Sequence, residues 1–204
     1  MRKVLSFFRR HPVSSIIVIL LLYVAIGALA PFAVPGQLSV DEKTFSKEDY
    51  YTEDPDALSA DRAHIVEENQ EALTQRIRML ELARKEVILS TFDFREDESG
   101  SDMMAAFYAA AERGVKVKLL LDGMNEFMYL ERSERFHALC THENVELRIY
   151  NPIDALHILN VNYRMHDKYL ITDEQMYLLG GRNSNDIFLG DRKTGINEDR
   201  EIFV

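Results

Sequence analysis

The feature that most limits the fold of this chain is an uncharged run of residues near the N-terminus. From Val13 to Val34 the sequence VSSIIVILLLYVAIGALAPFAV contains no charged side chain. Its length is close to the roughly 20 residues with which a helix crosses the apolar core of a bilayer. Residues 1–30 carry four basic residues and no acidic one. Because positively charged flanks stay in the cytoplasm, the sequence predicts a single-pass cell-membrane protein whose remaining residues lie on the extracytoplasmic side.

A cleaved signal peptide is the alternative interpretation of this run, with Ala28-Leu29-Ala30 as the small-residue cleavage site. We favour a retained anchor, because the run is long for a signal and Pro31 would follow the cut directly. The expected segments are a basic N-terminus over 1–11, a transmembrane anchor over 12–34, an acidic spacer over 35–58 and a folded domain over 59–204.

The part of the chain that follows the anchor is strongly acidic. The whole chain has a formal charge of −10, and the four basic residues of the first 30 leave −14 for the rest. Non-specific affinity for nucleic acid comes mainly from Lys and Arg displacing counterions. We therefore do not expect nucleic acid as a partner, and any recognition of phosphate must be local. Cys140 is the only cysteine, which excludes an intrachain disulfide.

The folded domain shows alternating helical and strand patterns. Helices are expected over 60–83, 102–113 and 127–140, and strands over 86–94, 115–122 and 145–152. For the second helix, Ser101 or Asp102 is the expected N-cap and Gly114 the stop signal. This alternation predicts an α/β fold with a mostly parallel sheet flanked by helices. Two more strands, 163–172 and 175–179, are expected on either side of a tight turn at Asp173-Glu174.

The stretch MHDKYLITDEQMYLLGGRN, residues 165–183, gathers residues suited to phosphate chemistry. On an extended strand His166 and Lys168 share a face. Imidazole can attack phosphorus or donate a proton near neutral pH, ammonium offers positive charge, and the amide of Asn183 supplies a neutral donor. Gly180 and Gly181 would let the backbone approach a ligand closely. The sequence therefore predicts a phosphate-handling site.

Written as a pattern, the stretch is H-x-K-x4-D-x6-G-G-x-N, which resembles the motif of the phospholipase D superfamily. The segments AAERGVKVKLLLDG and NYRMHDKYLITDEQMYLLGGRNSNDIFLGD are further similar to its bacterial cardiolipin synthase branch. The resemblance covers about residues 60–204. It implies a phospholipase D-like half that acts on phospholipid phosphodiesters through a phosphohistidine intermediate, with neither a metal nor another cofactor.

The resemblance also implies roles for individual residues. It assigns catalysis to His166, as nucleophile or acid, and to Lys168, with Asp173 in a supporting role. It assigns binding of the substrate phosphate to Lys168, Gly181 and Asn183. An acid should orient the ring of His166, and Glu201 or Asp199 are the candidates.

Three other residues near the motif have more than one interpretation. Asp93 and Asp122 are interpreted as turn residues at strand ends, although they could line the same site. Arg182 could contact a lipid head group or form a salt bridge with Asp186 or Asp191.

The family's active site takes one motif from each of two halves, and this sequence contains one. The second half is expected in the same full-length chain, of which these residues would be a fragment, or in a second copy of the chain. We favour the fragment. The expected activity is that of a phosphatidyltransferase or phospholipase. A membrane-tethered nuclease or other phosphodiesterase, or a non-catalytic relative, are the alternatives. The sequence leaves open the head group, the acceptor, the choice between transfer and hydrolysis, and the oligomeric state.

Overall fold

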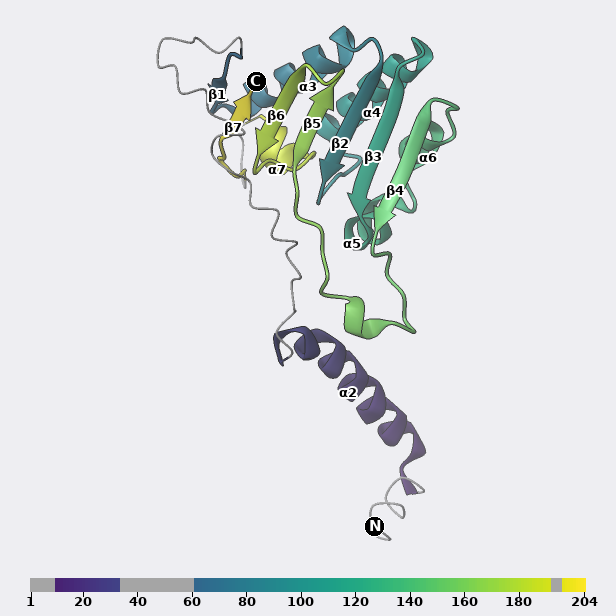
Figure 1. Ribbon diagram of the computed structural model, residues 1–204. Coiled ribbons are helices and arrows are strands. Elements are labelled where there is room, and N and C mark those ends of the chain that lie inside the picture. The colour runs from purple at the N-terminus through teal and green to yellow at the C-terminus, as the bar shows by residue number, and fades with distance from the viewer. Residues whose placement is uncertain (1–9, 34–60, 192–195) are drawn as a thin grey trace, which may run out of the picture. The chain divides into compact units, whose positions relative to one another are not determined.

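The computed structural model describes residues 10–33, 61–191 and 196–204, which form two compact units (Figure 1). One unit contains helix α2 (Pro12–Ala33) and the segment 153–163, which includes the 3₁₀ helix η3 (Ile158–Asn160). The other unit contains the remaining described residues. The predicted acidic spacer over 35–58 lies outside the described residues.

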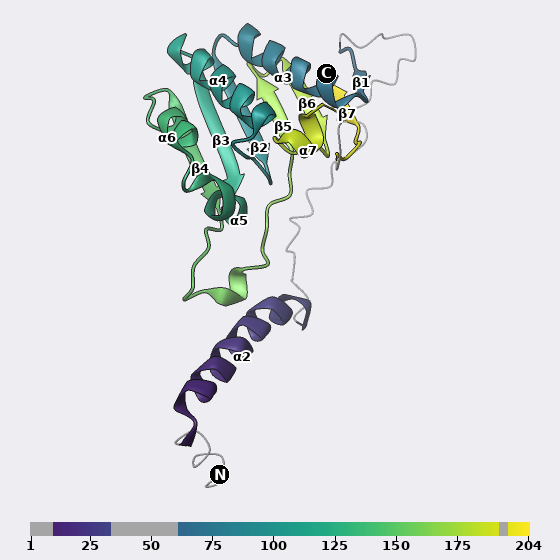
Figure 2. The ribbon, with the colours of Figure 1, turned by 180° about the vertical axis from the view of Figure 1, so that it is seen from behind.

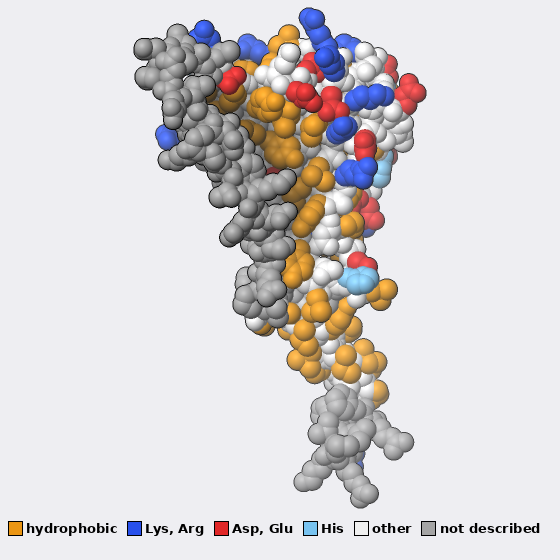
Figure 3. All heavy atoms as spheres, viewed as in Figure 1, with side chains coloured by type: hydrophobic (Ala, Val, Ile, Leu, Met, Phe, Trp, Pro, Cys, Tyr) orange, Lys and Arg blue, Asp and Glu red, His pale blue; other side chains and the backbone are white. Residues whose placement is uncertain are grey.

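Helix α2 is long and apolar enough to cross a membrane, as expected for residues 12–34. Its apolar side chains are mostly exposed instead of being packed into a protein core. Near its two ends, for example, Val13 is 69% exposed and Leu29 is 66% exposed. Figure 3 shows these apolar side chains gathered along the helix.

The second unit is a seven-stranded sheet in the spatial order β1-β7-β6-β5-β2-β3-β4. The strands are β1 (His64–Val66), β2 (Glu86–Thr91), β3 (Lys116–Asp122), β4 (Val145–Tyr150), β5 (Tyr169–Thr172), β6 (Met176–Gly180) and β7 (Glu201–Phe203). The helices are α3 (Asn69–Leu82), α4 (Glu98–Glu112), α5 (Gly123–Asn125), the π-helical η2 (Glu126–Leu130), α6 (Glu134–Cys140) and α7 (Asp186–Leu189). Figure 2 shows α3, α4, α6 and α7 on the same face of the sheet.

The sheet is mixed, so the α/β class is confirmed and the expectation of a mostly parallel sheet is wrong. Only β2–β3 and β3–β4 pair in parallel, and the other neighbouring strands are antiparallel. The tight turn at Asp173-Glu174 is present, with φ angles of 55° and 58°. Two successive positive φ angles are the geometry of a type I′ turn, which joins antiparallel strands. The hairpin β5–β6 then enters the sheet antiparallel to β2.

The first expected helix, over 60–83, is shorter than its pattern indicated. Within that range, His64–Val66 form β1, which pairs with β7 near the end of the chain, and α3 begins only at Asn69. A strand of three residues is too short to show an alternating pattern in the sequence. Its hydrogen bonds also depend on a partner strand that is distant in the chain.

Two further helices differ from expectation at their caps. Helix α4 begins about one turn before the expected cap at Ser101 or Asp102, because the Asp97 side chain accepts a hydrogen bond from the Gly100 amide at 3.0 Å. The helix expected over 127–140 is divided into η2 and α6. Ser133 starts α6 by accepting a hydrogen bond from the Phe136 amide at 3.0 Å, as N-cap serines do.

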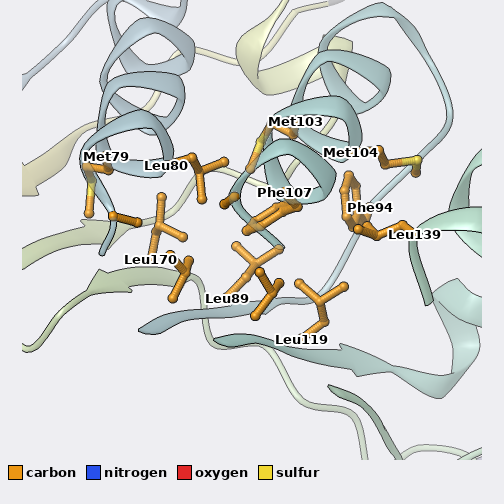
Figure 4. Packing of buried hydrophobic residues seen from close by; sticks show 14 of the residues in the cluster. Met79, Leu80, Leu89, Phe94, Met103, Met104, Phe107, Leu119, Leu139 and Leu170 are labelled. Carbon is orange, nitrogen blue, oxygen red and sulfur yellow. The ribbon is translucent and has the colours of Figure 1, made fainter. Parts of the chain in front are cut away.

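The hydrophobic core lies between the sheet and the helices on its covered face (Figure 4). Leu89 of β2, Leu119 of β3 and Leu170 of β5 point toward the helices. Phe107 of α4 and Leu80 of α3 pack onto them, and both are fully buried. This core fixes the ends of β2, β3 and β5, where the motif residues lie.

Replacing Phe107 by Ala should lower the free energy of unfolding by about 3–5 kcal/mol, because a large core side chain is removed and a cavity remains. Chemical denaturation of the full chain in detergent measures this change. Tyr108→Ala on the same helix is the control, since Tyr108 is 42% exposed. It should change the stability by less than about 1 kcal/mol. Equal losses in both variants would contradict the assignment of the core.

Candidate functional site

All the motif residues except Asp173 lie at one edge of the sheet. Strand β2 ends at this edge, and the segment with His166 and Lys168 leads from it into β5. Strand β6 returns to the same edge, where Gly180 pairs with Glu201 at the start of β7. His166 and Lys168 therefore precede the strand that the sequence placed them in, although both remain beside the end of β2.

His166 and Lys168 both contact the ring of Phe92, the residue that follows β2. The ring centroids of His166 and Phe92 are 5.1 Å apart, and Lys168 Nζ lies 5.9 Å from the Phe92 centroid. Lys168 Nζ also donates to the His166 carbonyl at 2.8 Å. His166 is exposed, whereas Lys168 is only 8% exposed. The two side chains thus share one side of the segment, with the imidazole outermost.

The charge of Lys168 is balanced by three nearby carboxylates. Burial lowers the pKa of the Lys168 ammonium, while Asp167, Asp199 and Asp93 act in the opposite direction. Water screens the charge of a partly buried ammonium less than that of an exposed one. The ammonium of Lys168 would therefore attract a phosphate oxygen more strongly than an exposed ammonium would.

Asn183 is held against the end of β2. Its Oδ1 accepts a hydrogen bond from the Asp93 amide at 3.1 Å, and no described residue accepts a hydrogen bond from its Nδ2. The Ser184 amide donates to the Asp93 carbonyl at 2.9 Å, and Phe94 and Ser184 form a parallel bridge. The side chain of Asp93 binds Arg95 and Asn125, which fixes this junction. Asn183 is thereby oriented with a donor group available.

Asp122 at the end of β3 fixes the chain just before the motif. Its carboxylate is fully buried and accepts from the Met165 amide at 3.0 Å and from Arg164 Nη1 at 3.1 Å. It also caps the following turn through the Met124 amide at 2.9 Å. The sequence interpretation of Asp122 as a turn residue is therefore incomplete. The missing signal was tertiary, because its partners at 164 and 165 are distant in sequence.

The two candidate acids that follow the motif have different surroundings. Asp199 faces the motif, since a Cβ atom at Gly181 would collide with the Asp199 carboxylate, whose charge also acts on Lys168. A side chain at position 181 would therefore have no room beside Asp199. Glu201 is buried in a bidentate ion pair with Arg76, at 2.7 and 2.5 Å. Asp199 is therefore the candidate that faces the motif.

Arg182 is fully buried and belongs to the same network as Glu201. It donates to the Asn69 side chain at 3.0 Å and to the carbonyls of Val66 and Glu67, and it lies 3.7 Å from Glu201. Because Arg182 is buried in these contacts, its guanidinium is not exposed to a lipid head group. Its described partners also do not include Asp186 or Asp191, the two candidates for a salt bridge. Arg182 instead fastens the start of α3 to the end of β6.

Asp173 lies at the opposite end of β5 from His166. Its carboxylate accepts hydrogen bonds from the amides of Arg84, Lys85 and Glu86, at 2.8–2.9 Å. Partial burial would raise the pKa of Asp173, but these three hydrogen bonds lower it. The residue ties the β5–β6 turn to the start of β2, which gives it a supporting position in the structure.

The arrangement offers an exposed imidazole, a largely buried ammonium, an oriented amide and a nearby carboxylate. These groups can attack phosphorus, bind phosphate oxygens and orient the imidazole. Among residues 10–33, 61–191 and 196–204, no group of three or more His, Cys, Asp or Glu side chains is placed to hold a metal ion.

More than half of the chain matches a known sequence family. The sequence family described as "Cardiolipin synthase, PLD-like domain" matches residues 76–189, more than half of the chain. Cardiolipin synthase C of Escherichia coli K12 is 28% identical over 153 residues, which cover 68% of this chain and 31% of the relative. Cardiolipin synthase B of the same organism is 37% identical over 103 residues, which cover 50% of this chain and 24% of the relative. The chain thus spans less than a third of the length of these relatives.

The fold also has solved counterparts. A phospholipase D family member, Nuc from Salmonella typhimurium, superposes with a TM-score of 0.51 at 17% identity, covering 70% of this chain and 81% of that one. At this identity the likeness concerns the fold alone, and it agrees with the fold that the motif predicted.

Substitution of the two acids should separate their roles. Glu201→Gln should lower the free energy of unfolding by about 3 kcal/mol or more, because Arg76 loses the charge of its buried partner. Asp199→Asn should change the stability by less than about 1 kcal/mol, since the side chain is only partly buried. It should nevertheless reduce phosphodiester turnover. Denaturation and turnover measured on both variants test this. A stable Glu201→Gln variant without activity would reverse the assignment.

Proposed function

This chain belongs to the phospholipase D superfamily, in the family described as "Cardiolipin synthase, PLD-like domain", and we propose on this basis that it acts on phospholipid phosphodiesters. The proposed activity is that of a phosphatidyltransferase or phospholipase with His166 as the nucleophile. Transfer to a phosphatidylglycerol hydroxyl gives cardiolipin, and transfer to water gives phosphatidic acid. The proposed location is the extracytoplasmic side of the cell membrane, with α2 as the anchor.

The observation that carries this proposal is the placement of His166 and Lys168 on one aromatic ring. The Phe92 ring supports both side chains, and the backbone after β2 also orients Asn183. A nucleophile, a cation and a neutral donor therefore converge at one sheet edge. Groups of these three kinds, held close together, are suited to binding a phosphate and attacking it.

The proposed reaction has two displacements at phosphorus. In the first, a ring nitrogen of His166 bonds to phosphorus while the bond to the head-group oxygen breaks, and the leaving oxygen takes a proton from a second imidazole. In the second, an acceptor hydroxyl gives its proton to that imidazole and attacks phosphorus, which breaks the phosphorus–nitrogen bond and frees His166. Two such steps have lower barriers than one direct exchange. Lys168 and Asn183 bind the phosphate oxygens throughout, and Asp199 orients the His166 ring.

The second imidazole has to come from another motif. None of the other histidines in the sequence is followed two residues later by Lys. We propose that the second motif belongs to a further part of the full-length protein or to a second copy of this chain.

A nuclease or other phosphodiesterase would use the same groups on a different substrate. The formal charge of −14 after residue 30 disfavours a polyanionic substrate, since nucleic acid binding requires many Lys and Arg contacts. The lipid substrate is therefore the better-supported proposal.

Expression of the protein in a bacterial host that lacks its own cardiolipin synthases tests the lipid activity. Membranes should accumulate cardiolipin or phosphatidic acid, and His166→Ala should abolish the product because the phosphorus–nitrogen bond cannot form. Lipid mass spectrometry distinguishes transfer from hydrolysis.

His64→Ala is the matched control, since His64 is exposed on β1 and pairs with Glu71. It should leave the product unchanged. A lipid profile that does not depend on His166, together with cleavage of a DNA oligonucleotide that does, would replace the lipid proposal by the nuclease alternative.

A further inference from the structure

The loop of residues 153–163 connects β4 to the motif segment and contacts α2 within one compact unit. The Tyr23 hydroxyl donates to the Ala155 carbonyl at 2.7 Å. The Asn162 side chain donates to the Ala28 carbonyl at 2.6 Å. Both ends of the loop are thus fastened to the C-terminal half of the apolar helix.

The positions of these two contacts along α2 can be measured from its C-terminal end. With a rise of 1.5 Å per residue, Ala28 lies about 7.5 Å and Tyr23 about 15 Å before the C-terminal end at Ala33. The hydrocarbon core of a bilayer is about 30 Å thick, close to the length of the 22-residue helix. If α2 spans the membrane, the loop lies beside its outer half and not wholly above the bilayer.

Beside acyl chains, polar groups need partners within the protein, and several polar groups of the loop have such partners. Within the loop, the amides of His157, Asn160 and Tyr163 donate to backbone carbonyls at 2.9–3.1 Å. The Leu156 amide donates to the Asp154 side chain at 2.8 Å. Asp154, the only carboxylate of the loop, pairs with His157 at 2.6 Å.

Three exposed side chains of the loop are apolar or amphipathic, beside the exposed polar residues Asp154, His157, Asn160 and Asn162. Leu156 is 85% exposed, Leu159 is 51% exposed and Tyr163 is 54% exposed. The loop contains no Lys or Arg. Leucines exposed to water would be unfavourable, whereas leucines in acyl chains and a tyrosine at the head-group level match the known preferences of membrane interfaces.

We propose that the loop of residues 153–163 inserts into the outer leaflet beside α2, so that the motif begins within three residues of a membrane-inserted segment. Two residues separate Tyr163 from His166, so the chain can extend about 10 Å between them. The insertion itself rests on α2 spanning the bilayer, and its use in positioning His166 rests on the proposed lipid function.

The absence of tryptophan from the sequence permits a direct test. Three single-tryptophan variants of the full chain are reconstituted into liposomes whose acyl chains are brominated, which quenches nearby indole fluorescence. Leu156→Trp probes the loop, Val18→Trp probes α2, and Tyr108→Trp on α4 is the water-exposed control. Emission from Leu156→Trp should be blue-shifted and quenched, as in Val18→Trp, whereas emission from Tyr108→Trp should be neither.

The other outcomes each overturn a defined part of the inference. If Val18→Trp is quenched and Leu156→Trp resembles Tyr108→Trp, the helix spans the membrane but the loop is not inserted. If Val18→Trp escapes quenching, both the span and the loop insertion are wrong. Blue-shifted emission from Leu156→Trp without quenching would indicate that a protein surface covers the loop instead of lipid. None of these measurements depends on turnover, so a His166→Ala background should give the same result.

Discussion

The antiparallel pairing of β5 with β2 is the constraint on which the rest of the site depends. It places the chain that enters β5 beside the chain that leaves β2, so that His166 and Lys168 reach Phe92. The hairpin then returns β6 to the same edge, which brings Asn183 to the Asp93 amide. Had β5 joined the sheet in parallel, its first residues would lie at the opposite edge, and the two parts of the motif could not meet.

Charged networks buried around this edge keep it in position. Glu201, Arg76, Arg182 and Asp122 are buried, and Arg164, which pairs with Asp122, is mostly buried. Such pairs contribute little net stability, because desolvation offsets most of their attraction. Their value here is geometric, since each joins segments that are distant in sequence. A site that has to orient an imidazole within fractions of an ångström benefits from supports of this kind.

A phospholipid substrate places a demand that a soluble substrate does not, because its phosphate stays at the surface of the bilayer. Under the proposed function, the apolar helix before the sheet and the loop immediately before the motif would meet that demand together, since the loop is hydrogen-bonded to the helix. The loop of residues 153–163 and the motif that begins at His166 are thereby neighbours in the sequence. The loop would act as a short connection between the lipid surface and the chemistry.

The sequence alone determined the features that rest on local pattern: the apolar helix, the strands β2, β3 and β4, the tight turn at Asp173-Glu174 and the motif that identifies the superfamily. Apolar periodicity, turn residues and motif spacing are local properties, so no knowledge of distant contacts is needed. Only the tertiary structure decided the mixed direction of the sheet, the strand at His64–Val66, the clamp formed by Asp122 and the different surroundings of Asp199 and Glu201. Each of these depends on pairing between segments that are far apart in the chain. The free energy of such pairing depends on both segments together, so neither segment predicts it alone.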